Sequence, residues 1–311
     1  MTTNITACPW QMKAIEMAAC SVLMLLSLVG NSMLVAVFYR NKSLRTMVHC
    51  FIANTAVSDL IIPMFFLPAK ISEIFHNGQW LVGGALGNIF CKIVWTAPNA
   101  SVIISMLSMM AIAVDRFYAI VFPMKTALLA RRRYLILLSW IFPIAVQSYW
   151  FFKIRIEENN NSFRCHKPER LLFYNLFLSL FILTAVTLTA LYSVIITTLY
   201  FQHTRLHLAN EATKLRAKEN RRVTIMLIFL VVPFYLLWIP FYVFECNPTN
   251  DCLLSWITCI LPLWYTIVNP VVLFIFSDTF RQGIKEIIVC CSRRKCKITC
   301  KITSVKLPVK G

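Results

Sequence analysis

One carboxylate stands deep inside an apolar stretch of this sequence. Asp59 lies near the middle of residues 46–71, a run that is otherwise almost free of charge. A carboxylate at such a depth in a membrane is costly and needs partners, so it is a candidate functional group. Polar residues of three other apolar runs stand at depths from which they could converge on it: Asn31, Ser105 and Asn269. Such a cluster could hold a small monovalent cation or a proton. The alternative is a packing role, with Asp59 hydrogen-bonded to Asn31 or Asn54.

A charged pair, Asp115-Arg116, ends another apolar run. The two side chains can neutralise each other, and when they separate the guanidinium of Arg116 becomes free to engage a partner. An ordinary anchor at the membrane interface is the alternative. Prolines interrupt three further runs and should kink their helices: Pro143, Pro233, Pro240 and Pro270. Kinked helices around a polar core suit a bundle with two arrangements.

The elements that must position these groups are membrane-spanning helices. The chain has 311 residues, of which 59% are hydrophobic and 14% charged, and its mean hydropathy is +0.68. Soluble proteins carry about 25% charged residues, so a soluble enzyme is excluded. Seven apolar runs each reach the roughly 20 residues that one span needs. The predicted fold is an all-α, seven-transmembrane helix bundle over residues 14–276, with helices at 14–39, 47–75, 91–117, 132–152, 170–200, 221–245 and 253–276. Residues 1–13 precede the bundle, residues 277–289 should form an amphipathic eighth helix, and residues 290–311 form a basic tail.

The distribution of charge predicts the orientation. The net charge is +18, and in the seven-span layout 23 of the 31 Lys and Arg residues fall on one side of the membrane. Positive loops stay in the cytoplasm, so we expect the N-terminus outside and the C-terminus inside. The basic character is then explained by topology and by anionic lipid, and no nucleic-acid partner is expected.

Cysteines and sequons follow the same layout. Cys91, Cys165 and Cys8 lie on the outer side, where disulfides can form, and the sequence assigns no partner to Cys8. Cys246 and Cys252 bracket a short outer loop and could pair with each other. The sequons at Asn4 and Asn160 predict glycosylation. Cys290 and Cys291 lie beside the membrane in basic surroundings and predict palmitoylation, with free thiols as the alternative.

Together these residues resemble the rhodopsin-like (class A) G protein-coupled receptors over essentially the whole chain. The resemblance rests on motifs in the order and spacing of that family: Gly30-Asn31, Ala56-Val57-Ser58-Asp59-Leu60, Trp80, Cys91, Asp115-Arg116-Phe117, Trp140, Phe234 with Trp238 and Pro240, Asn269-Pro270, and Phe280-Arg281. It implies a receptor that binds an extracellular ligand and activates a heterotrimeric G protein. It also implies a Cys91–Cys165 disulfide, a sodium ion near Asp59, and a switch at Asp115, Arg116, Trp238, Pro240, Asn269 and Pro270.

Several positions depart from the family pattern. Thr184 stands where most members have Pro, Leu273 replaces the Tyr of NPxxY, and Tyr265 occupies a position where an Asn commonly completes the sodium site. Glu219 and Asn220 lie near the place of an acid that opposes Arg116 in some members. The departures leave open a receptor with impaired signalling.

The ligand class follows mainly by exclusion. Leu263 replaces the retinal-binding Lys of opsins, and Pro98 replaces the Asp of amine receptors. Pro68, Trp80 and the long loop 153–170 are similar to neuropeptide receptors, with the loop as a hairpin lid. Glu73 and Glu245 could take a ligand cation, and Lys70 a carboxylate. The residues expected to line the ligand site are Lys70, Glu73, Trp95, Asn99, Gln147, Trp150, Tyr174, Trp238, Tyr242, Glu245 and Trp256.

The predicted function is therefore a receptor for a peptide-like ligand. Its expected partners are a G protein, arrestin and membrane lipids, and apart from sodium we expect no cofactor, no metal and no covalent chemistry. The alternatives are a class A receptor for a small molecule or lipid, and a seven-span transporter with Asp59 as carrier site. A transporter would commonly carry internal repeats, and none is visible here.

Overall fold

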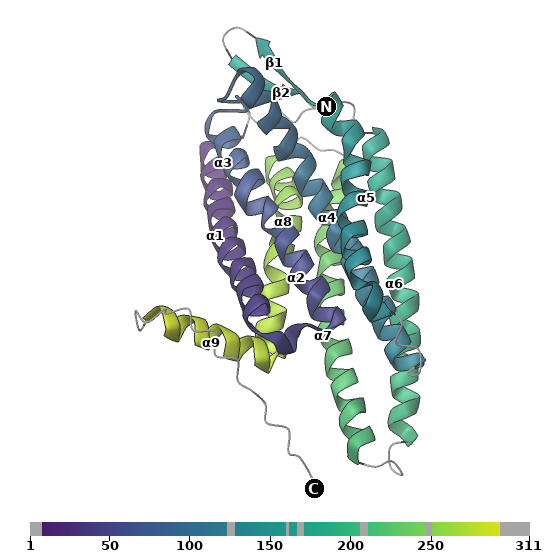
Figure 1. Cartoon of the computed structure of the whole chain (residues 1–311). Coiled ribbons are helices and arrows are strands. Elements are labelled where there is room, and N and C mark those ends of the chain that lie inside the picture. Colours follow the sequence, from purple (N-terminus) through teal and green to yellow (C-terminus); the bar gives the residue numbers. More distant parts are fainter. Residues whose placement is uncertain are drawn as a thin grey trace.

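The computed structural model describes residues 8–122, 128–159, 162–166, 171–205, 211–246 and 251–292. Long helices lie side by side in one bundle, with a β-hairpin over one end and a helix that leaves the bundle at the other (Figure 1). The elements are α1 (Trp10–Arg40), η2 (Lys42–Leu44), α2 (Met47–Asp59), η3 (Ile62–Phe66), α3 (Leu67–Phe75), α4 (Gly84–Val121), α5 (Leu128–Lys153), β1 (Arg155–Asn159), β2 (Ser162–His166), α6 (Leu171–Arg205), α7 (Glu211–Cys246), α8 (Cys252–Phe276) and α9 (Asp278–Ser292).

Seven stretches are long and apolar enough to cross a membrane. They are Trp10–Arg40, Met47–Phe75, Gly84–Val121, Arg132–Lys153, Asn175–Gln202, Thr213–Phe244 and Cys252–Phe276. Along α5 the exposed apolar residues Leu137, Ile141 and Ile144 recur at helical spacing, which places one apolar stripe on the outside of the bundle. In a membrane protein such a stripe faces lipid. The predicted seven-helix membrane fold with an eighth helix is confirmed.

The observed helices extend beyond the predicted limits at several ends. α4 begins at Gly84, seven residues before the predicted start, and α7 begins at Glu211, ten residues before it. Hydropathy marks only the part of a helix that lies in lipid, whereas a hydrogen-bonded helix can continue into water. Figure 1 shows the ends of α6 and α7 that lie away from the hairpin extending past the level of α9.

The second span is divided rather than continuous. α2 ends at Asp59, a π-helical turn covers Ile62–Phe66, and α3 continues to Phe75. Pro63 lies in this turn and has no amide hydrogen to donate. A π turn shifts the side chains that follow it around the helix axis, and such turns are frequent at functional sites.

A close approach between α1 and α8 fixes the position of the first motif. A Cβ atom at Gly30 would lie 2.8 Å from Cγ of Pro270, a distance that no side chain could accept without a shift. Asn31, the next residue, donates from Nδ2 to the carbonyl oxygen of Thr266 at 2.8 Å. Gly30-Asn31 therefore joins the first span to the kinked region of the last.

Two disulfides tie the end of the bundle that carries the hairpin. Cys91 of α4 is bonded to Cys165 of β2, the pair that the family resemblance implies. Cys252, at the start of α8, is bonded to Cys8 with a Cα–Cα distance of 5.9 Å. The predicted Cys246–Cys252 bridge is therefore wrong. The physical reason is that α1 packs against α8, which brings the segment before α1 to the start of α8.

α9 lies across the other end of the bundle. Phe280 is buried, and Gly283 packs so closely on α1 that a Cβ atom there would lie 2.6 Å from Cγ1 of Val37. Cys290 and Cys291 belong to the last turn of α9, although their side chains lie outside the described residues. The predicted glycosylation sites Asn4 and Asn160 also lie outside them.

Candidate functional site

A buried polar contact joins three spans at Asp59. This carboxylate is 2% exposed. Asn269 of α8 donates from Nδ2 to Asp59 Oδ2 at 2.8 Å, and the Ser105 hydroxyl of α4 lies 3.5 Å from Oδ1. Of the three residues predicted to converge on Asp59, Ser105 and Asn269 do so, whereas Asn31 bonds to the carbonyl groups of Ser27 and Thr266 instead.

The packing alternative named Asn31 and Asn54, and both bond elsewhere. Asn54 donates to the hydroxyls of Ser108 and Ser139 at 3.0 and 3.2 Å, and it accepts from Trp140 Nε1 at 2.8 Å. Asn31 donates to carbonyl groups of α1 and α8, while its Oδ1 is buried without a hydrogen-bond partner. That alternative is therefore wrong in its choice of partners.

The polar core offers oxygen atoms as potential ligands for a cation. A carboxylate and a hydroxyl face each other between α2 and α4, and hard cations prefer such oxygen ligands. The hydroxyl of Tyr265 lies 3.8 Å from Sδ of Met109 and also interacts with the side chain of Asn269, so it borders the polar core. The oxygens of Asp59 and Ser105 fit a small monovalent cation.

The charged pair near the C-terminal end of α4 is closed. Arg116 donates to Asp115 Oδ2 from Nε at 3.1 Å and from Nη2 at 2.5 Å. Glu219 of α7 is exposed, and within the part of the chain that the structure describes it forms no ion pair with Arg116. The guanidinium is therefore held by its own neighbour in sequence.

The N-terminal half of α7 is attached to α9 instead. Arg222 donates from Nη1 to Asp278 Oδ2 at 3.0 Å, and Arg281 also bonds to this carboxylate. The hydrogen bond and positive charge of Arg222, with the charge of Arg281, lower the pKa of Asp278. The carboxylate is consequently ionised at neutral pH and bridges two helices.

Aromatic rings pack around the predicted toggle residue. The ring centroid of Trp238 lies 6.1 Å from Phe177, 6.2 Å from Phe234 and 6.1 Å from Tyr242. α7 contains Pro240 two residues after Trp238. A rotation of α7 at this proline would have to repack these rings against α6.

The predicted ligand residues divide into two groups. On the side of α1, α3 and α8, Lys70 forms an ion pair with Glu16 at 3.6 Å, and Trp256 packs on the apolar cluster around Cys20 and Leu23. Trp95 stacks edge-on with Phe66 at 5.8 Å, and Asn99 donates to the Trp95 carbonyl. Glu16 was not predicted, and a lone acid in the first helix gave no signal that it would pair with Lys70.

The second group lies toward α5, α6 and α7. Gln147 is 4% exposed, and neither polar atom of its side-chain amide has a hydrogen-bond partner in the described part of the chain. Nε1 of Trp238 is likewise buried and has no hydrogen-bond partner among the described residues. Trp150 is buried against Tyr149, with ring centroids 5.0 Å apart. The side chains of Tyr174 and Glu245 lie outside the described residues.

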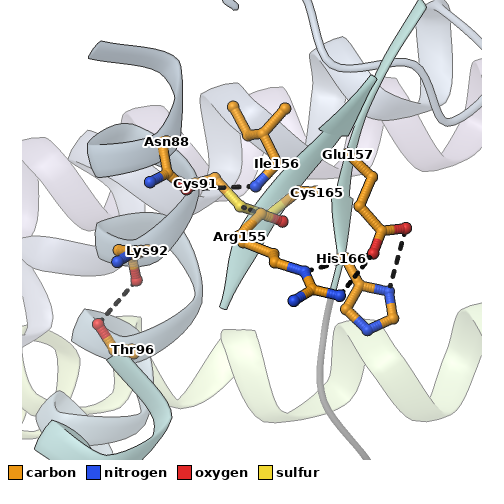
Figure 2. The surroundings of a disulfide bond; sticks show 9 residues. All are labelled: Asn88, Cys91, Lys92, Thr96, Arg155, Ile156, Glu157, Cys165 and His166. Atoms are coloured by element: carbon orange, nitrogen blue, oxygen red, sulfur yellow. Dashed lines mark hydrogen bonds and ion pairs between the residues drawn. A yellow bond between two sulfur atoms is a disulfide. The ribbon is translucent and has the colours of Figure 1, made fainter. Parts of the chain in front are cut away.

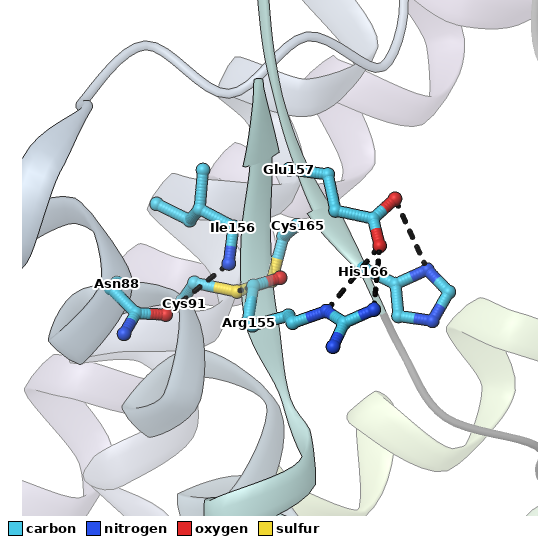
Figure 3. Close-up of polar contacts among 7 residues, drawn as sticks. All are labelled: Asn88, Cys91, Arg155, Ile156, Glu157, Cys165 and His166. Carbon is cyan, nitrogen blue, oxygen red and sulfur yellow. Dashed lines mark hydrogen bonds and ion pairs between the residues drawn. A yellow bond between two sulfur atoms is a disulfide. The ribbon is translucent and has the colours of Figure 1, made fainter. Parts of the chain in front are cut away.

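The hairpin closes over α4 through several contacts. Figure 2 shows the Cys91–Cys165 bond beside the hydrogen bond from Ile156 N to Asn88 Oδ1, which is 3.2 Å long. Figure 3 shows Glu157 between the side chains of Arg155 and His166. Trp80 N donates to the Phe163 carbonyl at 2.7 Å. The hairpin is therefore fixed to α4 and to the loop between α3 and α4, as a lid would have to be.

A shallow groove runs between the hairpin and the start of α4. Its lining consists of Gly84, Ala85, Asn88, Arg155, Ile156, Glu158 and Phe163. None of the predicted ligand residues lines this groove, so it is distinct from the two groups deeper in the bundle.

Comparison with known proteins places the chain in a family. A model of "7 transmembrane receptor (rhodopsin family)" matches residues 30–273. The mouse neuropeptide FF receptor 2 is 23% identical over 91% of this chain and 75% of its own length. The QRFP-like peptide receptor of Branchiostoma floridae is 26% identical over 89% and 78%, and the mouse substance-K receptor is 26% identical over 91% and 77%. This chain belongs to the rhodopsin family of seven-transmembrane receptors, which are multi-pass G protein-coupled receptors of the plasma membrane and not enzymes.

Proposed function

We propose that this receptor binds an extracellular peptide ligand and thereby activates a heterotrimeric G protein. The proposal rests on the arrangement of the outer half of the bundle. There a disulfide-tied hairpin covers helices that hold the buried side chains of Gln147 and Trp238, whose polar atoms have no hydrogen-bond partner among the residues that the structure describes. Two relatives that match about nine-tenths of this chain, the neuropeptide FF receptor 2 and the QRFP-like peptide receptor, are named for peptide ligands. A peptide offers backbone amides and charged ends to such groups.

The proposed orientation puts the hairpin outside and α9 in the cytoplasm. It rests on the excess of Lys and Arg at the end of the bundle that carries α9. It also agrees with the two disulfides at the opposite end, because disulfides persist in an oxidising compartment.

The ligand contacts follow from the polar groups that lack partners. Gln147 can donate to and accept from a ligand amide. Glu73 and Glu245 supply negative charge for an Arg or amine of the ligand. Lys70 already pairs with Glu16, so a ligand carboxylate would have to displace Glu16.

Activation follows from differential binding. The ligand favours one arrangement of the bundle only by the difference between its affinities for the two arrangements. In the proposed mechanism α7 moves at Pro240, the rings around Trp238 repack, and the Asp115–Arg116 pair separates. Arg116 then faces the G protein, and arrestin and lipids would contact the same side.

We also propose that Asp59 and Ser105 hold a sodium ion, with Asn269 fixing the carboxylate. The ion would neutralise the buried charge in the inactive arrangement. Replacing sodium chloride by choline chloride should then change the thermal stability of the wild-type receptor and leave Asp59→Asn unaffected. An equal response of both proteins would refute this site.

The function is tested by a screen for G protein activation in cells that express this chain. An amidated-peptide library is applied, with Arg116→Ala as control. A saturable response that the variant loses supports a signalling peptide receptor. Silence across the library, with the receptor demonstrated at the cell surface, would overturn the peptide assignment and turn the search to small molecules and lipids.

A further inference from the structure

One hydrogen bond crosses between the membrane-spanning parts of α7 and α6. Tyr235 of α7 donates from its hydroxyl to Oγ1 of Thr184 in α6 at 2.9 Å, and Thr184 is buried. Thr184 stands where most members of the family have Pro, and a proline has no hydroxyl to accept this bond. The contact is therefore a feature of this chain and not of the general family pattern.

The direction of the bond follows from the other contacts of Thr184. Its Oγ1 lies 2.9 Å from the carbonyl oxygen of Leu180 and 3.0 Å from that of Phe181. A carbonyl oxygen only accepts, so the single hydroxyl proton of Thr184 is used within α6. Tyr235 is consequently the donor, and without the Thr184 hydroxyl it would lose this partner in apolar surroundings, which is costly.

Tyr235 lies in the most easily bent part of α7. Pro233 and Pro240 stand on either side of it within the helix, and neither proline can donate the backbone hydrogen bond that its position would normally supply. Helices kink at such positions. A rotation of α7 at Pro240, as in the proposed mechanism, would move the hydroxyl of Tyr235 relative to α6.

The apolar contacts beside this bond depend less on the exact position of α7. The ring centroid of Phe181 in α6 lies 4.8 Å from that of Tyr235 and 4.6 Å from that of Tyr242. Rings can slide over one another and keep much of their contact, whereas an O–H···O bond requires a distance of about 2.5–3.0 Å and a suitable angle. The hydrogen bond is thus the contact that a movement of α7 breaks first.

The bond is present together with the closed Asp115–Arg116 pair. We infer that the Tyr235–Thr184 hydrogen bond restrains α7 against α6 and favours the closed arrangement of the receptor. Tyr235 and Thr184 are positioning residues, because they act through the position of α7 and not by contact with a ligand or a G protein. The inference rests on the α7 movement proposed above, but not on the identity of the ligand.

The test measures the position of α7 in the full-length receptor, without ligand and without G protein. The chain has 12 cysteines, so nitroxide labels are attached to genetically encoded ketone amino acids instead. These replace Tyr134 of α5 and Leu215 of α7, which are 74% and 68% exposed. Double electron–electron resonance in phosphatidylcholine nanodiscs then gives the fraction of receptors in which the two labels are far apart.

Tyr235→Phe removes the donor and keeps the ring, and Thr184→Val removes the acceptor and keeps the shape of the side chain. Each should raise the long-distance fraction about threefold, as expected for a hydrogen bond of average strength between membrane helices. The double variant should raise it no further, because the same bond is lost in all three proteins. Thr184→Ser keeps the hydroxyl and should resemble wild type.

The matched control is Thr189→Val, because the hydroxyl of Thr189 is exposed and donates to the carbonyl oxygen of Ala185 in its own helix. This variant should leave the fraction unchanged. Equal fractions in wild type, Tyr235→Phe and Thr184→Val would overturn the inference. So would a rise of the same size in the control, or a double variant in which the two effects add.

Nucleotide exchange on a purified G protein is measured with the same receptors. A long-distance fraction that rises without nucleotide exchange would support the restraint and count against the proposed G protein activation, whereas a rise in both supports both. Thermal unfolding checks that each variant is folded. If Thr184→Val does not fold, the comparison of Tyr235→Phe with wild type decides the question.

Discussion

At the scale of single residues, a buried amide without hydrogen bonds distinguishes a ligand-binding role from a stabilising role. Gln147 is buried, and within the described ranges of the chain neither its donor nor its acceptor is paired. Leaving such groups unpaired costs about 1–3 kcal/mol. We therefore expect Gln147→Met, which keeps the volume, to raise the stability of the unliganded receptor by roughly 1 kcal/mol. Thermal unfolding in detergent measures the change.

Asn54→Leu is the control for Gln147, because Asn54 bonds to Ser108, Ser139 and Trp140. Its loss should destabilise the receptor. If Gln147→Met lowers the unfolding temperature as Asn54→Leu does, then Gln147 stabilises the receptor by contacts of its own and is not reserved for a ligand.

At the scale of elements, α7 is fastened to α9 by Asp278. An outward movement of α7 must break the Arg222–Asp278 contact. Asp278→Asn should therefore raise basal G protein activation, by about twofold because exposed pairs are weak. The exchange Arg222→Asp/Asp278→Arg should restore the basal level. Nucleotide exchange on a purified G protein measures both.

The pH dependence of this contact follows from its lowered pKa. The folded state depresses the pKa of Asp278, so the contact stabilises above the ordinary carboxyl range and is lost only as pH falls through the lowered value. Basal activity should not change through this contact between pH 6 and 8.

Glu211→Gln, which breaks a pair within α7, is the control for Asp278→Asn. A rise in that variant equal to the rise in Asp278→Asn would contradict the role of Asp278 as a link between helices.

At the scale of the whole molecule, the features that could be predicted from the sequence are those that depend on local composition. Length and hydropathy predicted the seven spans. Asp59, Ser105 and Asn269 were correctly predicted to lie together, because the position of each residue within its apolar run indicates its depth in the membrane. Contacts between distant segments had no such signal. The Glu16–Lys70 pair, the π turn after Asp59 and the partner of Cys8 depend on how α1, α3 and α8 pack. The Cys246–Cys252 prediction failed because it assumed that neighbours in sequence are neighbours in space.

The Cys8–Cys252 bond offers a test of that packing. It joins residues 244 positions apart, and cross-links that close long loops commonly stabilise by about 2–4 kcal/mol. Cys8→Ser and Cys252→Ser should each lower the thermal unfolding temperature, and the double variant should lower it no further because one bond is lost in all three. Cys246→Ser should have no effect. The reverse pattern, with Cys246→Ser matching Cys252→Ser and Cys8→Ser silent, would mean that the short outer loop is closed by its own cysteines and that α1 is not linked to α8.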